Sequence, residues 1–187
     1  MTPELIKQAK IFIVDDEPTG VRLLERILNL SGYSNITMTT DSRRAIAMFT
    51  DDDPDLVLLD LHMPDPDGYE ILKAIRKLQP VDTYLPVIVL TADVTWEARR
   101  IALALGATDF LSKPLDDTEV KLRINNVLKT RFLHRQLLNE KALLEERVRE
   151  RTALLEQTIA ELKRACGMPI FSAPPATGRP GQSVGSL

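Results

Sequence analysis

Five polar side chains stand directly after four short runs of mainly apolar residues. Asp15 and Asp16 follow the first run, Asp60 the second, Thr91 the third and Lys113 the fourth. Ionised carboxylates that lie close together repel one another, so a cluster of them is costly unless a cation binds to it. Hard oxygen ligands suit Mg²⁺, which keeps several waters and binds substrate phosphates. A lysine and a hydroxyl would bind the oxygens of a transferred phosphoryl group, so these residue types indicate magnesium-dependent phosphoryl chemistry.

The second of these runs is typical of a buried strand that ends at an acid. Residues 56–59 are too few for a helix and too apolar for a half-exposed strand. A loop with two prolines and a glycine, 64–68, comes next. In an open parallel sheet, ligands bind beyond the carboxyl ends of the strands, which is where this interpretation places Asp60. Taken alone, Asp60 could equally cap a turn or a helix.

Short strands alternate with helices over most of the chain. Strands are predicted over 10–14, 35–39, 56–60, 85–90 and 109–111. Helices with one apolar face are predicted over 18–30, 42–49, 69–78 and 95–105. This alternation predicts an α/β fold with a five-stranded parallel sheet covered on both faces, doubly wound and flavodoxin-like, with strand order 2-1-3-4-5. Because strands one and three are then neighbours, we expect Asp15, Asp16 and Asp60 to meet.

The last predicted helix begins at an acidic segment, 116–119, which is favourable at a helix N-terminus. Neither proline nor glycine interrupts the sequence from there to residue 165. A helix of about 50 residues would be about 75 Å long, which is too long to pack on one domain of this size. We therefore expect this helix to project and to find a partner.

A seven-residue pattern of aliphatic residues fits the projecting part of that helix. The aliphatic core positions are Leu137, Leu144, Val148, Leu155 and Leu162. Lys141, Arg151 and Thr158 interrupt the pattern at the remaining core positions. The pattern predicts a parallel dimeric coiled coil, which would place both domains at one end and both outputs at the other. The alternative is a single solvated helix that i,i+4 charge pairs stabilise.

Composition excludes several classes of protein. The 187 residues include 24 Lys and Arg against 27 Asp and Glu, a balance that argues against a dedicated nucleic-acid surface. Cys166 is the only cysteine, so no intrachain disulfide can form and a reducing compartment is expected. No signal peptide and no apolar stretch of about 20 residues is evident, so we expect a cytoplasmic protein without a membrane segment.

The pairs Asp15-Asp16, Thr91-Ala92 and Lys113-Pro114, together with Asp60, resemble the signature of the receiver domain of bacterial two-component response regulators. The resemblance covers residues 10–129. It implies that Asp60 accepts a phosphoryl group from a sensor histidine kinase. The implied ligands of Mg²⁺ are Asp15, Asp16, Asp60 and the backbone carbonyl of His62. The residues that it implies for binding phosphoryl oxygens are Thr91, Ala92 and Lys113.

The same resemblance implies how the signal would be switched and tuned. Thr91 and Phe110 would change position on phosphorylation, and the signal would leave through the last helix. Pro114 would follow a cis peptide bond. His62 and Asp93 would influence how fast the phosphoryl group is lost to water.

The segments 129–137 and 144–156 resemble the helical linkers of response regulators that carry an HD-GYP cyclic-di-GMP phosphodiesterase. Similar linkers precede diguanylate cyclase and histidine kinase modules, and no output module follows here. We therefore expect an N-terminal extension (1–9), the receiver domain (10–129), an extended helix (130–166) and a tail (167–187). The tail is rich in proline, glycine and serine, as in a flexible segment or a truncated or frameshifted end.

Two other classes of function share part of this pattern. Phosphatases of the haloacid dehalogenase type also place an aspartate, a hydroxyl and a lysine on a doubly wound sheet, but their nucleophile lies in an Asp-x-Asp pattern after the first strand. Here Glu17 stands in the second acidic place. In a structural adaptor, the acidic site would be vestigial and the helix alone would carry the function. The presence of all the key residues counts against this alternative.

Overall fold

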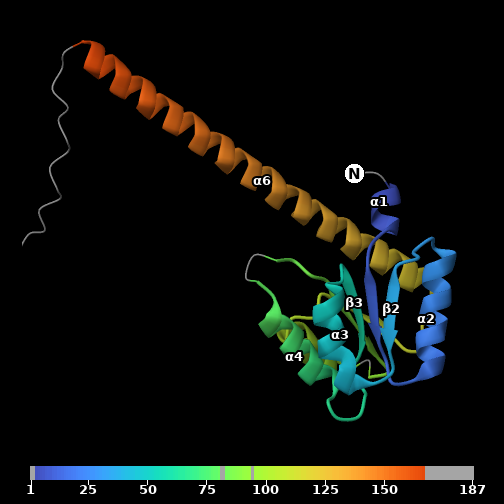
Figure 1. The fold of residues 1–187 in the computed structure, drawn as a ribbon. Helices are drawn as coiled ribbons and strands as arrows, with labels where there is room; N and C mark the ends of the chain where they lie inside the picture. The colour runs from blue at the N-terminus through green and yellow to red at the C-terminus, as the bar shows by residue number, and fades with distance from the viewer. Residues whose placement is uncertain (1–2, 81–82, 94, 167–187) are drawn as a thin grey trace, which may run out of the picture. The chain divides into compact units, whose positions relative to one another are not determined.

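The computed structural model describes residues 3–80, 83–93 and 95–166, so the predicted tail lies outside the described residues. Five parallel strands form one sheet in the order β2-β1-β3-β4-β5, which confirms the predicted topology (Figure 1). The strands are β1 (Ile11–Val14), β2 (Ile36–Thr39), β3 (Leu56–Asp60), β4 (Val87–Thr91) and β5 (Asp109–Ser112). Every residue of β1, β3 and β4 is buried, which explains why these strands are apolar up to the terminal Asp60 of β3 and Thr91 of β4.

Helices cover both faces of the sheet. They are α1 (Pro3–Lys7), α2 (Pro18–Leu30), α3 (Ala45–Asp52), α4 (Gly68–Leu78), α5 (Trp96–Ala104) and α6 (Asp117–Ala165), and a 3₁₀ turn (Ser42–Arg44) precedes α3. Residues of α1, α2 and α6 share one core cluster, and residues of α3, α4 and α5 share the other. Figure 1 shows α2 on one side of the sheet and the α3–α4 pair on the other. Alternate residues of β1 enter the two clusters, as the two-residue period of a strand requires.

The N-terminal segment contributes to the core, which the sequence pattern did not predict. Ile6 and Ala9 are buried against α2 and the sheet. The Lys7 ammonium lies over the Tyr33 ring at 4.3 Å and donates to the carbonyl of Ser31 just after α2. Five residues are too few to display a helical period, and only the tertiary contacts reveal why α1 forms.

The chain divides into two compact units, Met1–Asn139 and Glu140–Leu187. The first contains the sheet and α6 as far as residue 139. The described part of the second unit consists of the rest of α6, whose large aliphatic side chains are exposed: Leu143, Leu144, Val148, Leu154, Leu155, Ile159 and Leu162. Among the helices of the described ranges, none combines the length and the apolarity that a membrane span requires.

Candidate functional site

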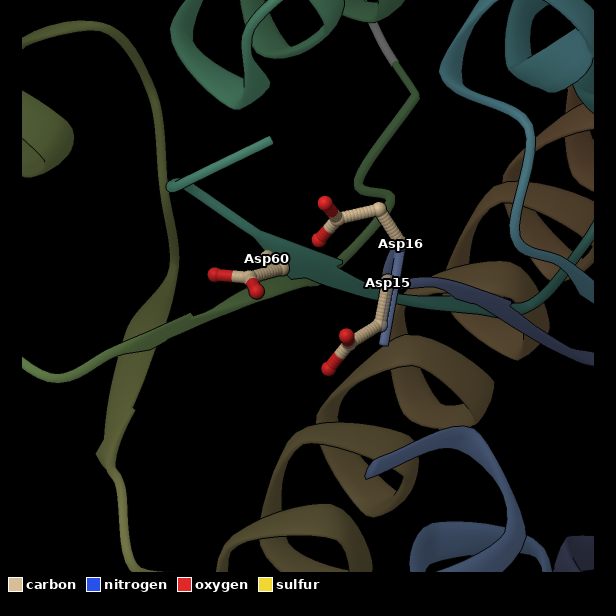
Figure 2. A group of neighbouring side chains, drawn as sticks. All are labelled: Asp15, Asp16 and Asp60. Atoms are coloured by element: carbon tan, nitrogen blue, oxygen red, sulfur yellow. The ribbon is translucent and has the colours of Figure 1, made fainter. Parts of the chain in front are cut away.

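Three aspartates meet at the carboxyl ends of β1 and β3 (Figure 2). Asp15 and Asp16 follow β1, Asp60 ends β3, and the pairing of Val14 with Leu59 sets the two ends side by side. One carboxylate oxygen from each aspartate lies within 4.8 Å of the others. The side chain of Asp15 is fully buried and that of Asp60 nearly so. The topology thus produces the carboxylate cluster that the sequence predicted.

Lys113 supplies the positive charge of this cluster. It follows β5, and its Nζ lies 2.6 Å from Asp60 Oδ2 and 2.9 Å from Asp15 Oδ2. Burial alone would lower the pKa of the Lys113 ammonium, but its hydrogen bonds to Asp60 and Asp15 outweigh burial and raise that pKa. The lysine is therefore charged at neutral pH and offsets the repulsion between two carboxylates.

The start of α2 shapes the surroundings of Asp15. Asp15 Oδ1 accepts a hydrogen bond from the amide of Glu17 at 2.9 Å. Burial raises the pKa of the Asp15 carboxyl, although Lys113 and the Glu17 amide act in the opposite direction. A Cβ at Gly20 would lie 2.8 Å from Asp15 Oδ2, so only glycine leaves this space beside the carboxylate open.

A tight loop after β3 holds Asp60. Its Oδ1 accepts a hydrogen bond from the amide of His62 at 3.0 Å. A Cβ at Gly68 would lie 2.1 Å from the carbonyl oxygen of Asp60, so the loop can fold back this closely only with glycine there. Asp67 caps α4 by accepting from the amide of Glu70 at 2.8 Å, which ends the loop.

The cluster fits Mg²⁺ by the chemistry of its donors. The three carboxylates are hard oxygen ligands, and Mg²⁺ uses few protein ligands because it keeps waters and binds substrate phosphates. Among the described residues, the Asp16 carboxylate forms no hydrogen bond or ion pair, so it is available to a cation. The role of the His62 carbonyl stays a prediction.

Thr91 lies at the end of β4 with its hydroxyl engaged elsewhere. Thr91 Oγ1 accepts from the amide of Asp93 at 3.0 Å and donates to the Asp93 carbonyl at 3.3 Å. The Thr91 carbonyl also accepts from the amide of Lys113 at 2.8 Å. Hydrogen bonds from Thr95 lower the pKa of the Asp93 carboxyl. The side chains of Ala92 and His62 are exposed near these ends of the strands.

Two arginines that no sequence pattern distinguishes flank the Phe110 ring. The Arg99 guanidinium lies 4.2 Å from the ring centroid and that of Arg123 lies 5.3 Å from it. Arg123 also binds both carboxylate oxygens of Asp109, at 2.7 and 2.8 Å. The Lys113–Pro114 peptide bond is cis. The Asp65–Pro66 bond is cis as well, which no sequence pattern predicted.

The model of the "Response regulator receiver domain" family matches residues 11–125. The chain is 41% identical to a "Probable transcriptional regulator ycf27" of Galdieria sulphuraria over 127 residues, which are 67% of this chain and 47% of that protein. It is 37% identical to "Response regulator PleD" of Caulobacter vibrioides over 66% of this chain and 26% of that protein. The chain thus spans about half the length of the ycf27 regulators that it matches.

Solved structures show the same fold. The chemotaxis protein CheY4 of Vibrio cholerae superposes with a TM-score of 0.60 at 28% identity, over 64% of this chain and 98% of that one. NtrX of Brucella abortus superposes with a TM-score of 0.64 at 30% identity, over 71% of this chain and 29% of that one.

Proposed function

Because the chain belongs to the response regulator receiver domain family of two-component systems, we propose that Asp60 accepts a phosphoryl group from a sensor histidine kinase in a Mg²⁺-dependent reaction. Receiver domains are signalling domains rather than classical enzymes. The observation that carries the proposal is the contact of Lys113 Nζ with both Asp60 and Asp15, at 2.6 and 2.9 Å, beside Asp16. A single site thus offers a nucleophilic carboxylate, ligands for a cation and an ammonium for phosphoryl oxygens.

In this reaction a carboxylate oxygen of Asp60 attacks the phosphorus of the phosphohistidine. The phosphorus–nitrogen bond breaks, and the histidine nitrogen keeps the electron pair. The chemistry that bound Mg²⁺ supplies is neutralisation of negative charge on the carboxylates and on the phosphoryl oxygens. Asp15, Asp16, Asp60 and the carbonyl of His62 would hold it. Lys113 Nζ then binds a phosphoryl oxygen in place of a carboxylate.

Phosphorylation adds charge and strong acceptor oxygens beside the end of β4. The Thr91 hydroxyl can bind a phosphoryl oxygen only if it gives up its hydrogen bonds with Asp93, which are 3.0 and 3.3 Å long. Phe110 then rotates into the space that Thr91 leaves. His62 and Asp93 stand two residues after Asp60 and Thr91, where they adjust access of water to the phosphoryl group.

We also infer that the signal leaves through α6 and a parallel dimer of this helix, toward an output domain outside this chain. The aliphatic residues at the five predicted core positions are all about 60% exposed: Leu137, Leu144, Val148, Leu155 and Leu162. A stripe of this kind is buried only when a partner covers it. The match to Response regulator PleD covers 26% of that protein, so most of PleD lies outside the matched region. This supports the proposal of an output domain.

The test is phosphorylation by a small phosphodonor, such as acetyl phosphate, followed by intact mass spectrometry. The chain should gain one phosphoryl group when Mg²⁺ is present and none when a chelator removes the metal. Asp60→Asn should abolish the gain, and Asp51→Asn, which removes an exposed acid from α3, should leave it unchanged. Labelling of Asp60→Asn at the parent level would refute the assignment. Repeated turnover of the donor that depends on Asp15 would instead indicate a phosphatase of the haloacid dehalogenase type.

A further inference from the structure

Charged side chains join α6 to the sheet at the end where the strands begin. Asp60 lies at the opposite end, where the strands finish. Asp55 is buried and stands directly before β3. Its Oδ1 lies 2.7 Å from Nη1 of Arg135 and 3.6 Å from Nε of Arg131. Its Oδ2 accepts from the backbone amide of Lys10 at 3.3 Å. We call Asp55, Arg131 and Arg135 the Asp55 anchor.

Arg131 is the most constrained member of the anchor. It is only 8% exposed, and its Nη1 donates to the carbonyl of Tyr84 at 2.6 Å, just ahead of β4. Burial lowers the pKa of the Arg131 guanidinium, and the nearby Asp55 carboxylate opposes this effect. A buried guanidinium is stable only beside an anion. Arg131 therefore ties α6 to the segments that lead into β3 and β4.

The anchor also fixes which face of α6 points away from the sheet. Arg131 and Arg135 are four residues apart and lie on one face of the helix. Leu133 and Leu137 each come two residues after one of these arginines, about 200° around the helix. Their exposed fractions are 56% and 63%, in contrast to Leu128, which is fully buried on the sheet side. The two leucines therefore stand on the face opposite the anchor.

We propose that the Asp55 anchor is a positioning device that fixes which face of α6 a second copy of this chain contacts. Leu137 is the first core contact, and Leu133, one turn earlier, flanks it. The inference rests on the dimer of the proposed function. The occupant is a second copy because Leu137 opens the heptad series, and a parallel pair brings identical positions of the two helices together. Without the anchor, Val120, Ile124 and Leu128 still hold the first turns of α6 in the core. The turns from residue 131 onward lose their charged contacts with the sheet, so other faces of these turns can meet the partner.

Cysteine cross-linking in the full chain tests this directly. With Cys166 replaced by Ser, the parent carries either Leu137→Cys or Asn139→Cys, two exposed positions on different faces of α6. At a core position of a parallel pair, two cysteines approach within the range of a disulfide. Oxidation should therefore cross-link Leu137→Cys about tenfold faster than Asn139→Cys.

Variants of the anchor should remove this preference. Arg135→Gln changes a side chain that is half-exposed, so the fold is kept, and Asp55→Asn provides a second, stronger variant. In both, the two cross-linking rates should become similar. Arg149→Gln removes the same charge from the exposed side chain of a residue outside the predicted core positions and should leave the preference intact.

The outcomes separate this inference from the proposed function. If light scattering finds the parent monomeric in the presence of Mg²⁺ and beryllium fluoride, an acyl-phosphate mimic, the proposed dimer fails and the inference fails with it. If the parent is dimeric but Arg135→Gln keeps the tenfold preference, or Leu137→Cys has no preference, the anchor does not position α6 and the dimer stands. Phosphorylation of Asp60 is measured separately and does not depend on either result.

Discussion

At the scale of single residues, the site is a balance of buried charges. Lys113 contacts two of the three carboxylates, yet burial still raises the pKa of Asp15. The cluster therefore carries a cost in stability, as the perturbed ionisable groups of functional sites commonly do. An additional cation should stabilise the folded chain.

This cost makes stability depend on pH. Because the pKa of Asp15 is raised in the folded state, the folded chain keeps this proton at pH values where the unfolded chain has lost it. The contribution of Asp15 to the free energy of unfolding therefore falls as the pH rises through the raised pKa, and the loss persists at neutral pH. Asp15→Asn should be more stable than the parent at neutral pH and equally stable near pH 3, below the ordinary Asp pKa of about 4.

Urea unfolding at both pH values, without metal, measures this difference. The exposed acid Asp51 provides the matched control, since Asp51→Asn should change little at either pH. Mg²⁺ should then stabilise the parent and fail to stabilise Asp15→Asn. A neutral-pH stability of Asp15→Asn below that of the parent would show that the carboxylate is stabilising as it stands.

At the scale of elements, Arg76 joins three parts of the chain. It lies on α4, donates from Nε to the carbonyl of Gly106 at 2.8 Å and from Nη1 to the carbonyl of Leu85 at 2.8 Å. Gly106 has a φ of 102°, and a Cβ there would lie 2.8 Å from Arg76 Nε. The turn before β5, the chain before β4 and the end of α4 thus depend on one guanidinium.

We expect Arg76→Met to lower the free energy of unfolding by about 2 kcal/mol or more, because partly buried carbonyls lose a charged donor. Lys77→Met, an exposed neighbour on the same helix, is the control and should stay within about 0.5 kcal/mol of the parent. Chemical denaturation at neutral pH is sufficient to compare them. Equal stability of the two variants would mean that solvent replaces the lost hydrogen bonds.

At the scale of the whole molecule, the exposed leucines of α6 carry the proposed assembly. Leu144 stands at a predicted core position and Leu143 beside it does not, although their exposed fractions are similar, 59% and 53%. In the presence of Mg²⁺ and beryllium fluoride, an acyl-phosphate mimic, light scattering should give the mass of a dimer. Leu144→Lys should give a monomer, because it places like charges at facing core positions of the coiled coil. Leu143→Lys should stay dimeric. Equal behaviour of the two variants would contradict the heptad register.

Much of this molecule follows from local sequence, and the rest depends on contacts between distant residues. The alternation of five short strands with helices was enough to predict the sheet order, and the acids at the ends of two of these strands then predicted the meeting of Asp15, Asp16 and Asp60. The predicted start of β4 at residue 85 was two residues early, since Pro86 has no amide to donate and the strand begins at Val87.

Other features have no local signal. Arg99 of α5 and Arg123 of α6 flank Phe110 of β5, so this contact depends on three separate elements. The Asp55 anchor joins residues about 80 positions apart, because α6 returns along the sheet. Arg131 is buried and Arg135 is exposed although both lie on one face of α6, and only the packing separates them.

The most direct test of the central claim is the position of the phosphoryl group itself. The chain is treated with acetyl phosphate and Mg²⁺ and then with borohydride, which reduces an acyl phosphate to an alcohol, and the modified residue is located by peptide mass spectrometry. We predict modification at Asp60, dependent on Mg²⁺. Modification at Asp15 or Asp16 instead, or at no aspartate when Mg²⁺ is present, would contradict the assignment of Asp60 as the phosphoacceptor.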